Sequence, residues 1–246
     1  MEITKLFEDS LAYPTKDWNK VLKFGVLIFI MGIVSILGSV GFVLGHLNVN
    51  TLLSEVNIIA AILSIFITAI ILIVFSLIIS GYNLSITKNT INDVDSDIPE
   101  LNLTKNFVDG LKVAILYIVY SIIPCIIGSI VAFLSFGLLG IVPLILWIVF
   151  GALFLIAIAI LAETGSLTEA INIVNVFKKI DEIDWGDYII WLILAVVILT
   201  IIFIVTSLIM FIPLIGIIAT ILIFIPYVNM FGARAIGLIY NESKIS

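Results

Sequence analysis

Long apolar runs constrain this chain more than any other feature of its sequence. A helix that crosses a lipid bilayer needs about 20 apolar residues. Residues 21–45 and 58–80 are two such runs, and two longer ones, 113–162 and 188–240, can each hold two helices. We expect these longer runs to break near residues 135–140 and 211–213, where glycine or proline occurs. The sequence therefore predicts an all-α membrane bundle of six transmembrane helices, at about residues 21–45, 58–80, 113–135, 140–162, 188–210 and 214–239.

The composition agrees with a membrane protein. Hydrophobic residues make up 63% of the chain and charged residues only 11%, whereas a soluble domain carries about 25% charged residues. The net charge of −6 argues against a nucleic-acid partner, which selects basic surfaces. The single cysteine, Cys125, makes no internal disulfide and no thiolate metal cluster. We expect membrane lipids as partners, a homo-oligomer as an open possibility, and neither a cofactor nor a metal ion.

The basic residues predict the orientation. All 11 of them lie in or beside the N-terminal segment, in or beside the second and fourth connections, or at the C-terminal end of the last run. They are Lys5, Lys16, Lys20, Lys23, Lys88, Lys105, Lys112, Lys178, Lys179, Arg234 and Lys244. Since positive charge is retained in the cytoplasm, we expect a multi-pass protein of the cell membrane with both termini cytoplasmic.

The six runs form three hairpins, each preceded by an amphipathic segment at the charged face. Trp18, Phe107 and Trp185 occupy comparable places just before a run, and we expect them to anchor at headgroup level. Residues 1–20 are expected to be an interfacial segment and 21–246 the membrane domain. The N-terminal helix would place its apolar side chains in the interface; these are Ile3, Leu6, Phe7 and Leu11.

The third amphipathic segment carries a helix start signal. Ser166 and Glu169 have the spacing of a capping box. Ile171, Val174 and Phe177 then fall on one helix face, which predicts a second short interfacial helix.

Several short motifs carry a resemblance to a known family. They are Tyr13-Pro14, Asp17-Trp18, Gly81-Tyr82, Ile98-Pro99, residues 106–112 and 120–124, Ala235-Ile236-Gly237 and Tyr240. On these residues the chain resembles domain of unknown function four thousand and thirteen, a family mainly of archaea. The resemblance implies a six-helix membrane protein and brings no established activity. The family is distantly similar to the membrane domain of some glycerophosphodiester phosphodiesterases, but this chain has no such catalytic domain.

Two ionisable residues near the ends of the predicted spans are candidates for a structural ion pair. Glu163 lies at the end of the fourth span and Arg234 near the end of the sixth. An ionisable group at membrane depth is expensive unless it is paired or reaches water. A Glu163–Arg234 pair would join the two helices; the alternative is that each side chain reaches the interface separately.

Proline and glycine mark further candidate features. Pro124 and Pro226 each remove a backbone donor and are expected to kink their helices. Asn229 lies one turn after Pro226, and its side-chain amide could donate to a carbonyl that the proline leaves without a partner. Gly41 and Gly45 form a GxxxG motif that allows close helix packing.

Residues 93–97 alternate aspartate with other residues, as in the first half of a calcium loop. The glycine and glutamate that such a loop needs next are missing, so we expect an acidic, solvated linker.

Two function classes follow from the sequence. The absence of Asp, Lys and His from the centres of the spans argues against a proton relay or an ion filter, and no catalytic motif is present. We therefore expect a non-enzymatic scaffold, accessory or membrane-organising protein. The alternative is a small transporter or channel for an apolar or amphipathic solute. A closed bundle filled by side chains would favour the scaffold, and a water-filled cavity beside Pro124 and Asn229 would favour the alternative.

Overall fold

The computed structural model describes residues 3–47, 54–134 and 140–244 of the chain. Within these residues every element of regular secondary structure is a helix, and six helices are long and apolar enough to cross a membrane. The predicted all-α class with six transmembrane helices is confirmed. The chain is a multi-pass membrane protein.

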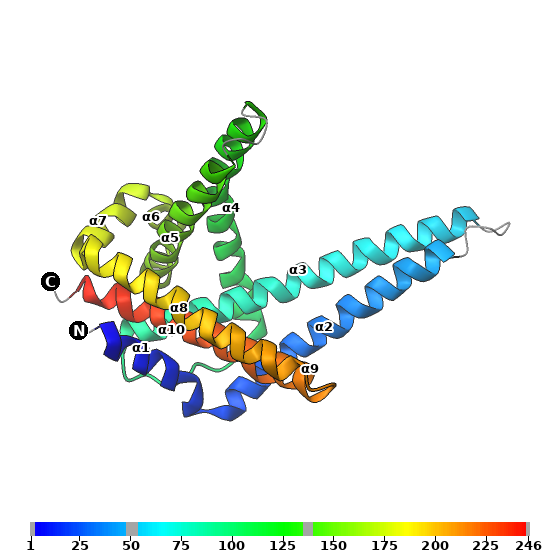
Figure 1. The fold of residues 1–246 in the computed structure, drawn as a ribbon, viewed down its shortest axis with the longest axis horizontal. Coiled ribbons are helices and arrows are strands. Elements are labelled where there is room, and N and C mark those ends of the chain that lie inside the picture. Colours follow the sequence, from blue (N-terminus) through cyan, green and yellow to red (C-terminus); the bar gives the residue numbers. More distant parts are fainter. Residues whose placement is uncertain (1–2, 48–53, 135–139, 245–246) are drawn as a thin grey trace.

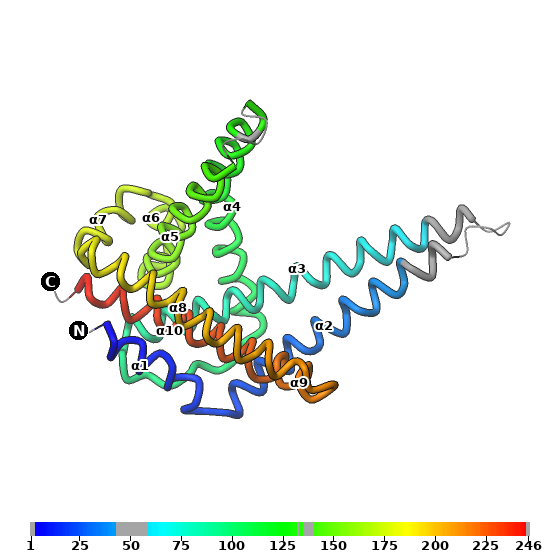
Figure 2. The backbone as a smooth tube through the Cα atoms, viewed as in Figure 1, coloured from blue at the N-terminus to red at the C-terminus, as the bar shows by residue number. Residues whose placement is uncertain are grey.

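Three helical hairpins diverge from a common base (Figures 1 and 2). The first consists of α2 (Trp18–Leu47) and α3 (Ser54–Asn92), and the second of α4 (Leu103–Leu134) and α5 (Ile141–Thr164). In the third, α8 (Trp185–Met210) is followed by α9 (Ile215–Ala219), a π-helical turn (Thr220–Phe224) and α10 (Ile225–Glu242). The turn between α8 and α9 lies at the predicted break, whereas the other predicted break, apart from Gly140, lies outside the described residues.

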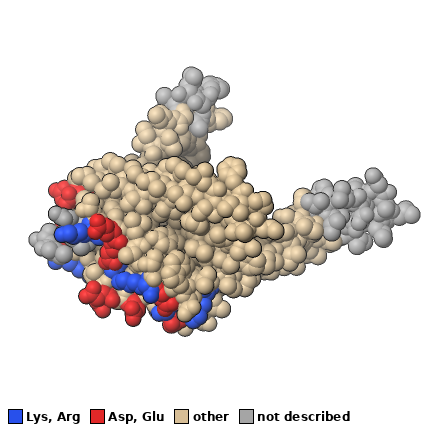
Figure 3. Space-filling view, turned by 60° about the horizontal axis from the view of Figure 1, so that its bottom comes forward, with Lys and Arg blue, Asp and Glu red and all other residues tan. Residues whose placement is uncertain are grey.

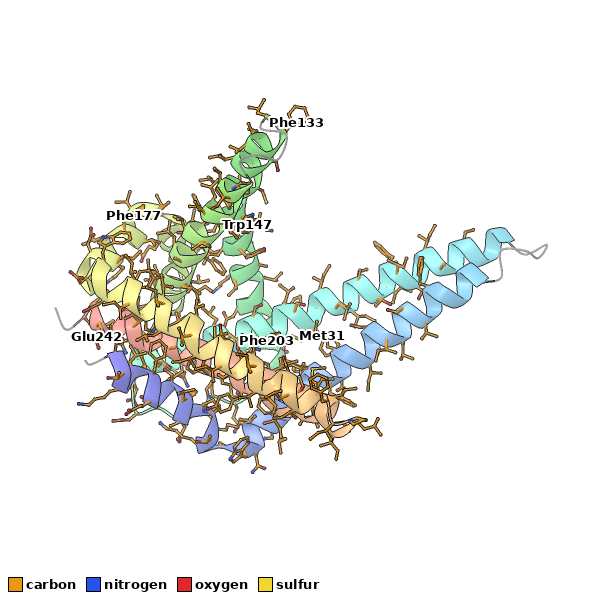
Figure 4. The ribbon with its side chains drawn as sticks, in the orientation of Figure 1. Met31, Phe133, Trp147, Phe177, Phe203 and Glu242 are labelled. Atoms are coloured by element: carbon orange, nitrogen blue, oxygen red, sulfur yellow. The ribbon has the colours of Figure 1, made fainter. Side chains whose placement is uncertain are left out.

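Among the described residues, the base holds the charged side chains, the first and last residues and the buried core. Figure 3 shows the Lys, Arg, Asp and Glu side chains gathered at one end of an otherwise uncharged surface. The buried apolar residues of α2, α5, α8 and α10 form two clusters at this end. Farther out the hairpins separate and their side chains face outward, as Phe133 does at the tip of α4, where it is 81% exposed (Figure 4). Apolar surface of this kind is stable in contact with lipid.

Short helices at the base precede two of the hairpins. They are α1 (Ile3–Ala12), which continues into a 3-10 turn (Tyr13–Lys16), and α6 (Leu167–Ile171) with α7 (Ile173–Ile183). Half of the predicted capping box of α6 forms: the Ser166 hydroxyl accepts a hydrogen bond from the Glu169 N–H at 3.4 Å, whereas the Ser166 N–H donates to the Thr164 hydroxyl. The one helix predicted over Ile171, Val174 and Phe177 is divided at Asn172 into α6 and α7. The segment before the second hairpin is not a separate helix, because α4 begins at Leu103 and continues unbroken through it.

The apolar face of α1 contacts protein, which corrects its expected contact with lipid. Leu6 and Phe7 are buried, and the Phe7 ring stacks on Trp191 of α8 and Phe231 of α10 at 6.2 Å from each. The helix is thus part of the core at the base, because two aromatic rings from the third hairpin cover the face that its own sequence leaves apolar.

The α7 helix has two apolar faces, of which the sequence predicted one. Val176, Ile180 and Ile183 are buried against the bundle, whereas the predicted face keeps Val174 and Phe177 exposed. Phe177 lies beside Trp185 at the start of α8, with 5.8 Å between the ring centroids.

Glycines allow the close crossing of α3 and α4. A Cβ atom on Gly81 would lie 1.7 Å from the Asn106 carbonyl oxygen, and one on Gly110 would lie 1.9 Å from that of Leu77. Each of the two glycines therefore leaves the space that a backbone carbonyl of the other helix occupies. Gly81 and residues 106–112 are also among the motifs that carried the family resemblance.

The GxxxG motif of α2 packs within the chain. A Cβ atom on Gly41 would lie 2.6 Å from the Ser64 hydroxyl of α3, and Gly38 meets Thr68 in the same way. The side-chain surroundings of Gly45 lie outside the described residues.

Candidate functional site

The base is organised around Arg234, which α10 carries into a fully buried position. Its Nη2 atom lies 2.7 Å from Asp9 Oδ2 of α1 and donates to the Val94 carbonyl, while Nη1 lies 3.3 Å from the Thr90 hydroxyl. The guanidinium also lies over the Tyr13 ring, 4.7 Å from its centroid. A buried guanidinium needs such partners to offset its lost hydration. Arg234 thereby joins α1, α3 and α10.

The predicted Glu163–Arg234 ion pair is wrong. Glu163 Oε1 pairs with Lys244 at 2.8 Å, and Glu163 Oε2 accepts a hydrogen bond from the Tyr240 hydroxyl. Tyr240 follows Arg234 by six residues, which places the two on different faces of α10 at 3.6 residues per turn. Glu163 lies against the Tyr240 face, whereas α1 covers the Arg234 face.

The linker between α3 and α4, residues 93–102, is tied to the base by its backbone carbonyls, and we call it the strap. Arg234 binds the Val94 carbonyl, and the Lys20 ammonium donates to Ile98 at 2.6 Å. Tyrosine hydroxyls reach two more carbonyls, from Tyr13 to Asp97 at 3.5 Å and from Tyr82 to Pro99 at 3.0 Å.

The strap is acidic, as expected, but it is ordered by side chains from four other segments, and Ile98 is buried in the core. Within the described residues, no group of three His, Cys, Asp or Glu is placed to hold a metal ion.

Tyr13 lies between the strap and Arg234. Burial raises the pKa of its hydroxyl to about 12, although the neighbouring Arg234 charge opposes this. The phenol is therefore neutral at ordinary pH and acts as a hydrogen-bond donor and an aromatic surface.

A cavity of about 520 Å³ lies next to the base, on the side where the hairpins diverge. Residues of α3, α4, α5, α8 and α10 form its walls. Its lining is mostly apolar. The polar lining residues are Ser76, Ser80, Asn83, Thr87, Tyr117 and Asn229. Among the described residues that line it, none is ionisable at neutral pH.

A second cavity of about 490 Å³ lies between α8 and the start of α10. Leu199 of α8 and Val228 and Asn229 of α10 line both cavities, so the two adjoin between these helices. Phe203 and Phe224 make this second cavity strongly apolar. Figure 4 shows Phe203 on α8, beyond the base.

The Asn83 and Asn229 carboxamides connect α3 to α10 in the wall of the cavity. Asn83 Nδ2 donates to Asn229 Oδ1 at 2.8 Å, and Asn229 Nδ2 donates to the Ile225 carbonyl of its own helix at 2.9 Å. The Asn229 amide therefore donates to a backbone carbonyl near Pro226, which is the type of bond that we expected. Its acceptor precedes the proline directly and is not one that the missing Pro226 N–H frees.

A π-helical turn lies just before Pro226, where the Ile225 N–H bonds Thr220 O, and the kink at Pro226 stays a prediction. In this turn the Leu222 carbonyl meets α2: a Cβ on Gly25 would lie 2.2 Å from its oxygen. Pro124 lies inside α4, which continues through it, and its effect on the helix direction stays a prediction.

α10 presents different faces to α1 and to the cavity. Toward α1, the Tyr227 hydroxyl donates to the Leu11 carbonyl, Phe231 stacks on Phe7 and Arg234 pairs with Asp9. Toward the cavity it presents Asn229 and Gly232, among others. A movement of α10 would therefore change both sites.

The three predicted anchors differ in their surroundings. Trp18 and Trp185 are 47% and 40% exposed at the first residues of α2 and α8. Phe107 instead packs partly into the core at the base. The two tryptophans have the exposure that headgroup contact requires, and Phe107 serves mainly in packing.

The polar seam between α3 and α10 was missed in the sequence, although its signal is present there. Ser76, Ser80, Asn83, Thr87 and Thr90 recur at alternating spacings of four and three, which places them on one face of α3. Thr87 donates to the Ala233 carbonyl at 3.0 Å, and Thr90 contacts Arg234. One polar stripe thus leads from the cavity to Arg234.

Comparison with known proteins agrees with this architecture. Residues 64–211, more than half of the chain, match the model of a family described as Protein of unknown function (DUF4013). The match includes Gly81-Tyr82, Ile98-Pro99 and residues 106–112, but not the motifs near the two chain ends. No curated protein and no solved structure matches the chain significantly. The predicted family is confirmed, and the chain belongs to the DUF4013 family.

Proposed function

We propose that this protein is a non-enzymatic membrane protein that binds an amphipathic, lipid-like molecule between its hairpins. The cavity of about 520 Å³ carries the proposal. Its volume lies in the range of small-molecule sites, about 300–1,000 Å³. An apolar wall with a few polar groups on one helix face suits a molecule with an alkyl chain and a small polar end.

The adjoining cavity supports this assignment. A chain that leaves the first cavity past Leu199 and Val228 enters one lined by Phe203 and Phe224. We accordingly propose membrane lipids as the partners. Binding of a lipid between the hairpins is consistent with a membrane-organising role.

Transport of the same kind of molecule is a second candidate. The π-helical turn directly precedes Pro226, and Thr220 and Phe224 from this turn line the second cavity. Broken helices beside a binding site are a common feature of transporters. A fluorescent amphiphile that crosses the bilayer faster in proteoliposomes than in empty vesicles would favour this candidate.

A cavity-filling substitution tests the proposed binding directly. A Cβ on Gly232 meets nothing within 4 Å, and Gly232 lines the cavity. Gly232→Phe therefore places a ring in the cavity without displacing backbone. Gly32→Phe is the matched control, because Gly32 is equally open but lies on α2 and outside both cavities.

Native mass spectrometry of the purified full-length protein measures its bound lipid. We expect Gly32→Phe to retain lipid as the unmodified protein does, and Gly232→Phe to lose at least about tenfold, since a methylene-sized mismatch already costs a comparable factor. Equal lipid binding by both variants would overturn the proposal.

We also propose that the base faces the cytoplasm of the cell membrane, with both termini there. The concentration of all basic residues at this end supports it. In a Cys125→Ala background, Lys178→Cys should react with an impermeant thiol reagent only after permeabilisation of the cells. Phe211→Cys, at the exposed turn between α8 and α9, should react in intact cells. The reverse pattern would reverse the orientation.

A further inference from the structure

The cavity of about 520 Å³, which we call the central cavity, continues along the second hairpin as well as the third. A third cavity, of about 200 Å³, lies between α4 and α5, and Tyr117 and Phe154 line both it and the central cavity. Their rings pack edge to face, with 5.8 Å between the centroids. Tyr117 is 53% exposed, so a chain can cross this pair on its open side and enter the third cavity.

The lining residues of these two cavities share one face of each helix. On α4 they recur at spacings of four, at positions 113, 117 and 121. On α5 they recur at spacings of four and three, at positions 158, 154, 151 and 147. The first members of each series line the central cavity and the last members line the third. The two cavities are therefore successive parts of one groove, which we call the second-hairpin arm.

The third hairpin carries an equivalent groove, the third-hairpin arm. It leads from the central cavity into the second cavity along one face of α8, at positions 199, 203, 206 and 210. Trp147 lies in the second-hairpin arm and Phe203 in the third-hairpin arm, on hairpins that diverge from the base (Figures 1 and 4). An unbranched chain that starts in the central cavity can follow only one of the two arms.

Two serine hydroxyls are open to the central cavity. Ser76 is exposed and Ser80 partly exposed, so an atom of a bound molecule can reach them. Among the described residues neither hydroxyl has a hydrogen-bond partner, whereas Ser121 and Thr206 donate to the carbonyl four residues earlier. A free hydroxyl in an apolar cavity is a donor for an ester or ether oxygen, which can only accept.

The linkage that these serines contact has no charge. Among the described residues that line the three cavities, none is charged at neutral pH. An ammonium, carboxylate or phosphate there would be desolvated without a counter-ion. The described residues therefore suit an uncharged group at Ser76 and Ser80 and apolar chains in both arms.

We infer that the bound molecule is a two-chain lipid, with its uncharged ester or ether linkages at Ser76 and Ser80 and one chain in each arm. This inference rests on the proposed function and names the ligand class for that cavity. One chain passes Leu199 and the other passes Tyr117.

Two uncharged lipids with the same sixteen-carbon chain test the inference. Dihexadecanoylglycerol has two chains and monohexadecanoylglycerol has one. Each is added at the same mole fraction to the delipidated full-length protein in detergent, and native mass spectrometry compares the adducts. Phenylalanine substitutions then block one arm at a time.

Gly151→Phe blocks the second-hairpin arm, because Gly151 lines the third cavity and a Cβ there meets nothing within 4 Å. Gly32→Phe is its control, as before. Thr206→Phe blocks the third-hairpin arm. Its control is Thr200→Phe, on the same helix and likewise bonded to the carbonyl four residues earlier, but outside the three cavities.

We expect each arm variant to lower the binding of the two-chain lipid at least about tenfold, since a methylene-sized mismatch already costs a comparable factor. The one-chain lipid needs only one arm, so at least one arm variant should bind it as the unmodified protein does. Both controls should bind both lipids as the unmodified protein does.

The serines are tested separately. Ser76→Ala combined with Ser80→Ala should weaken the binding of both lipids about tenfold, as the loss of two hydrogen bonds predicts. Ser35→Ala combined with Ser39→Ala, a pair with the same spacing on α2, is the control. Unchanged binding without Ser76 and Ser80 would overturn the placement of the linkages.

The outcomes separate the two proposals. Loss of the two-chain lipid in only one arm variant, or in neither, with loss of both lipids in Gly232→Phe, would overturn the two-chain inference and leave the proposed function standing. Loss of the one-chain lipid in both arm variants would overturn the inference as well, because the arms would then not act as separate chain sites. Binding of both lipids that is unchanged in Gly232→Phe would contradict the proposed function itself.

Discussion

Arg234 and Asp9 are 225 positions apart in the sequence, yet their charged atoms lie 2.7 Å apart at the base of the bundle. Arg234 is fully buried, whereas the Asp9 side chain is 32% exposed. The pair joins the N-terminal helix to the last transmembrane helix, and the guanidinium also holds the strap at Val94. Because α10 lines the cavity with its other side, this pair stabilises the helix that carries Asn229.

Removal of Asp9 should destabilise the protein more than removal of any exposed ion pair. Asp9→Ala leaves the Arg234 charge buried without its carboxylate, and we expect a loss of about 3 kcal/mol, the low end for a buried pair because Asp9 is partly exposed. Thermal unfolding in detergent measures the loss. Lys23→Ala is the control; its ammonium contacts Glu100 at 3.8 Å with both side chains mostly exposed, and it should cost under about 0.5 kcal/mol.

The double variant Asp9→Leu with Arg234→Met should recover much of that stability, because neither charge remains to be compensated. A double variant no more stable than Asp9→Ala would show that the pair is needed for reasons other than charge.

A methyl group at the α3–α4 crossing should be poorly tolerated. Gly110→Ala places a Cβ where the Leu77 carbonyl oxygen now lies and should force the two helices apart, at a cost of about 3 kcal/mol. Gly151→Ala on α5 is open and exposed, so the same change there should stabilise by about 0.5–1 kcal/mol. The melting temperatures of the two variants should move in opposite directions. Equal shifts would exclude close packing at Gly110.

Release of the strap should expose it to proteolysis. Lys20→Met combined with Tyr82→Phe removes the donors to the Ile98 and Pro99 carbonyls while keeping most of the side-chain packing. A glutamate-specific protease should then cleave after Glu100 at least about tenfold faster, as the loss of two hydrogen bonds predicts. Lys23→Met, which loses only a contact to the Glu100 carboxylate, should be cleaved at the original rate.

Tyr13 should make stability fall at high pH. Its pKa is about 12 in the folded protein and about 10 when unfolded, so the folded state keeps the phenol proton over a range where the unfolded state releases it. The contribution is fully present below pH 10 and is lost as the pH rises toward 12. Tyr13→Phe keeps the ring over Arg234 and should lose less stability between pH 9 and 11.5. A parallel fall in both proteins would contradict this role.

Hydropathy was sufficient to predict the six transmembrane helices, because each needs a long apolar run and the chain has such runs only where these helices lie in the described residues. It was less informative at the helix ends. α3 continues past residue 80 to Asn92, where polar residues such as Thr87 and Thr90 are buried by α10 and no apolar run continues. Tertiary contacts extend this helix beyond the predicted span.

Pairing of ionisable groups depends on which helix face meets which neighbour. Glu163 and Arg234 were paired on depth alone, and α1 was assigned to lipid because its own face is apolar. Both predictions failed for one reason: α1 occupies the face of α10 that carries Arg234. The polar stripe on α3 was readable at positions 76, 80, 83, 87 and 90, but its partner Asn229 becomes evident only once α3 and α10 lie side by side.

A structure determined by electron cryomicroscopy in lipid nanodiscs would test the central claim most directly. We predict elongated density between α3, α4, α5, α8 and α10, with its polar end toward the polar side of the cavity at Ser76 and Ser80 and a chain directed past Leu199. Closure of α8 onto α3 and α5, with side chains filling the cavity and no such density, would contradict the account.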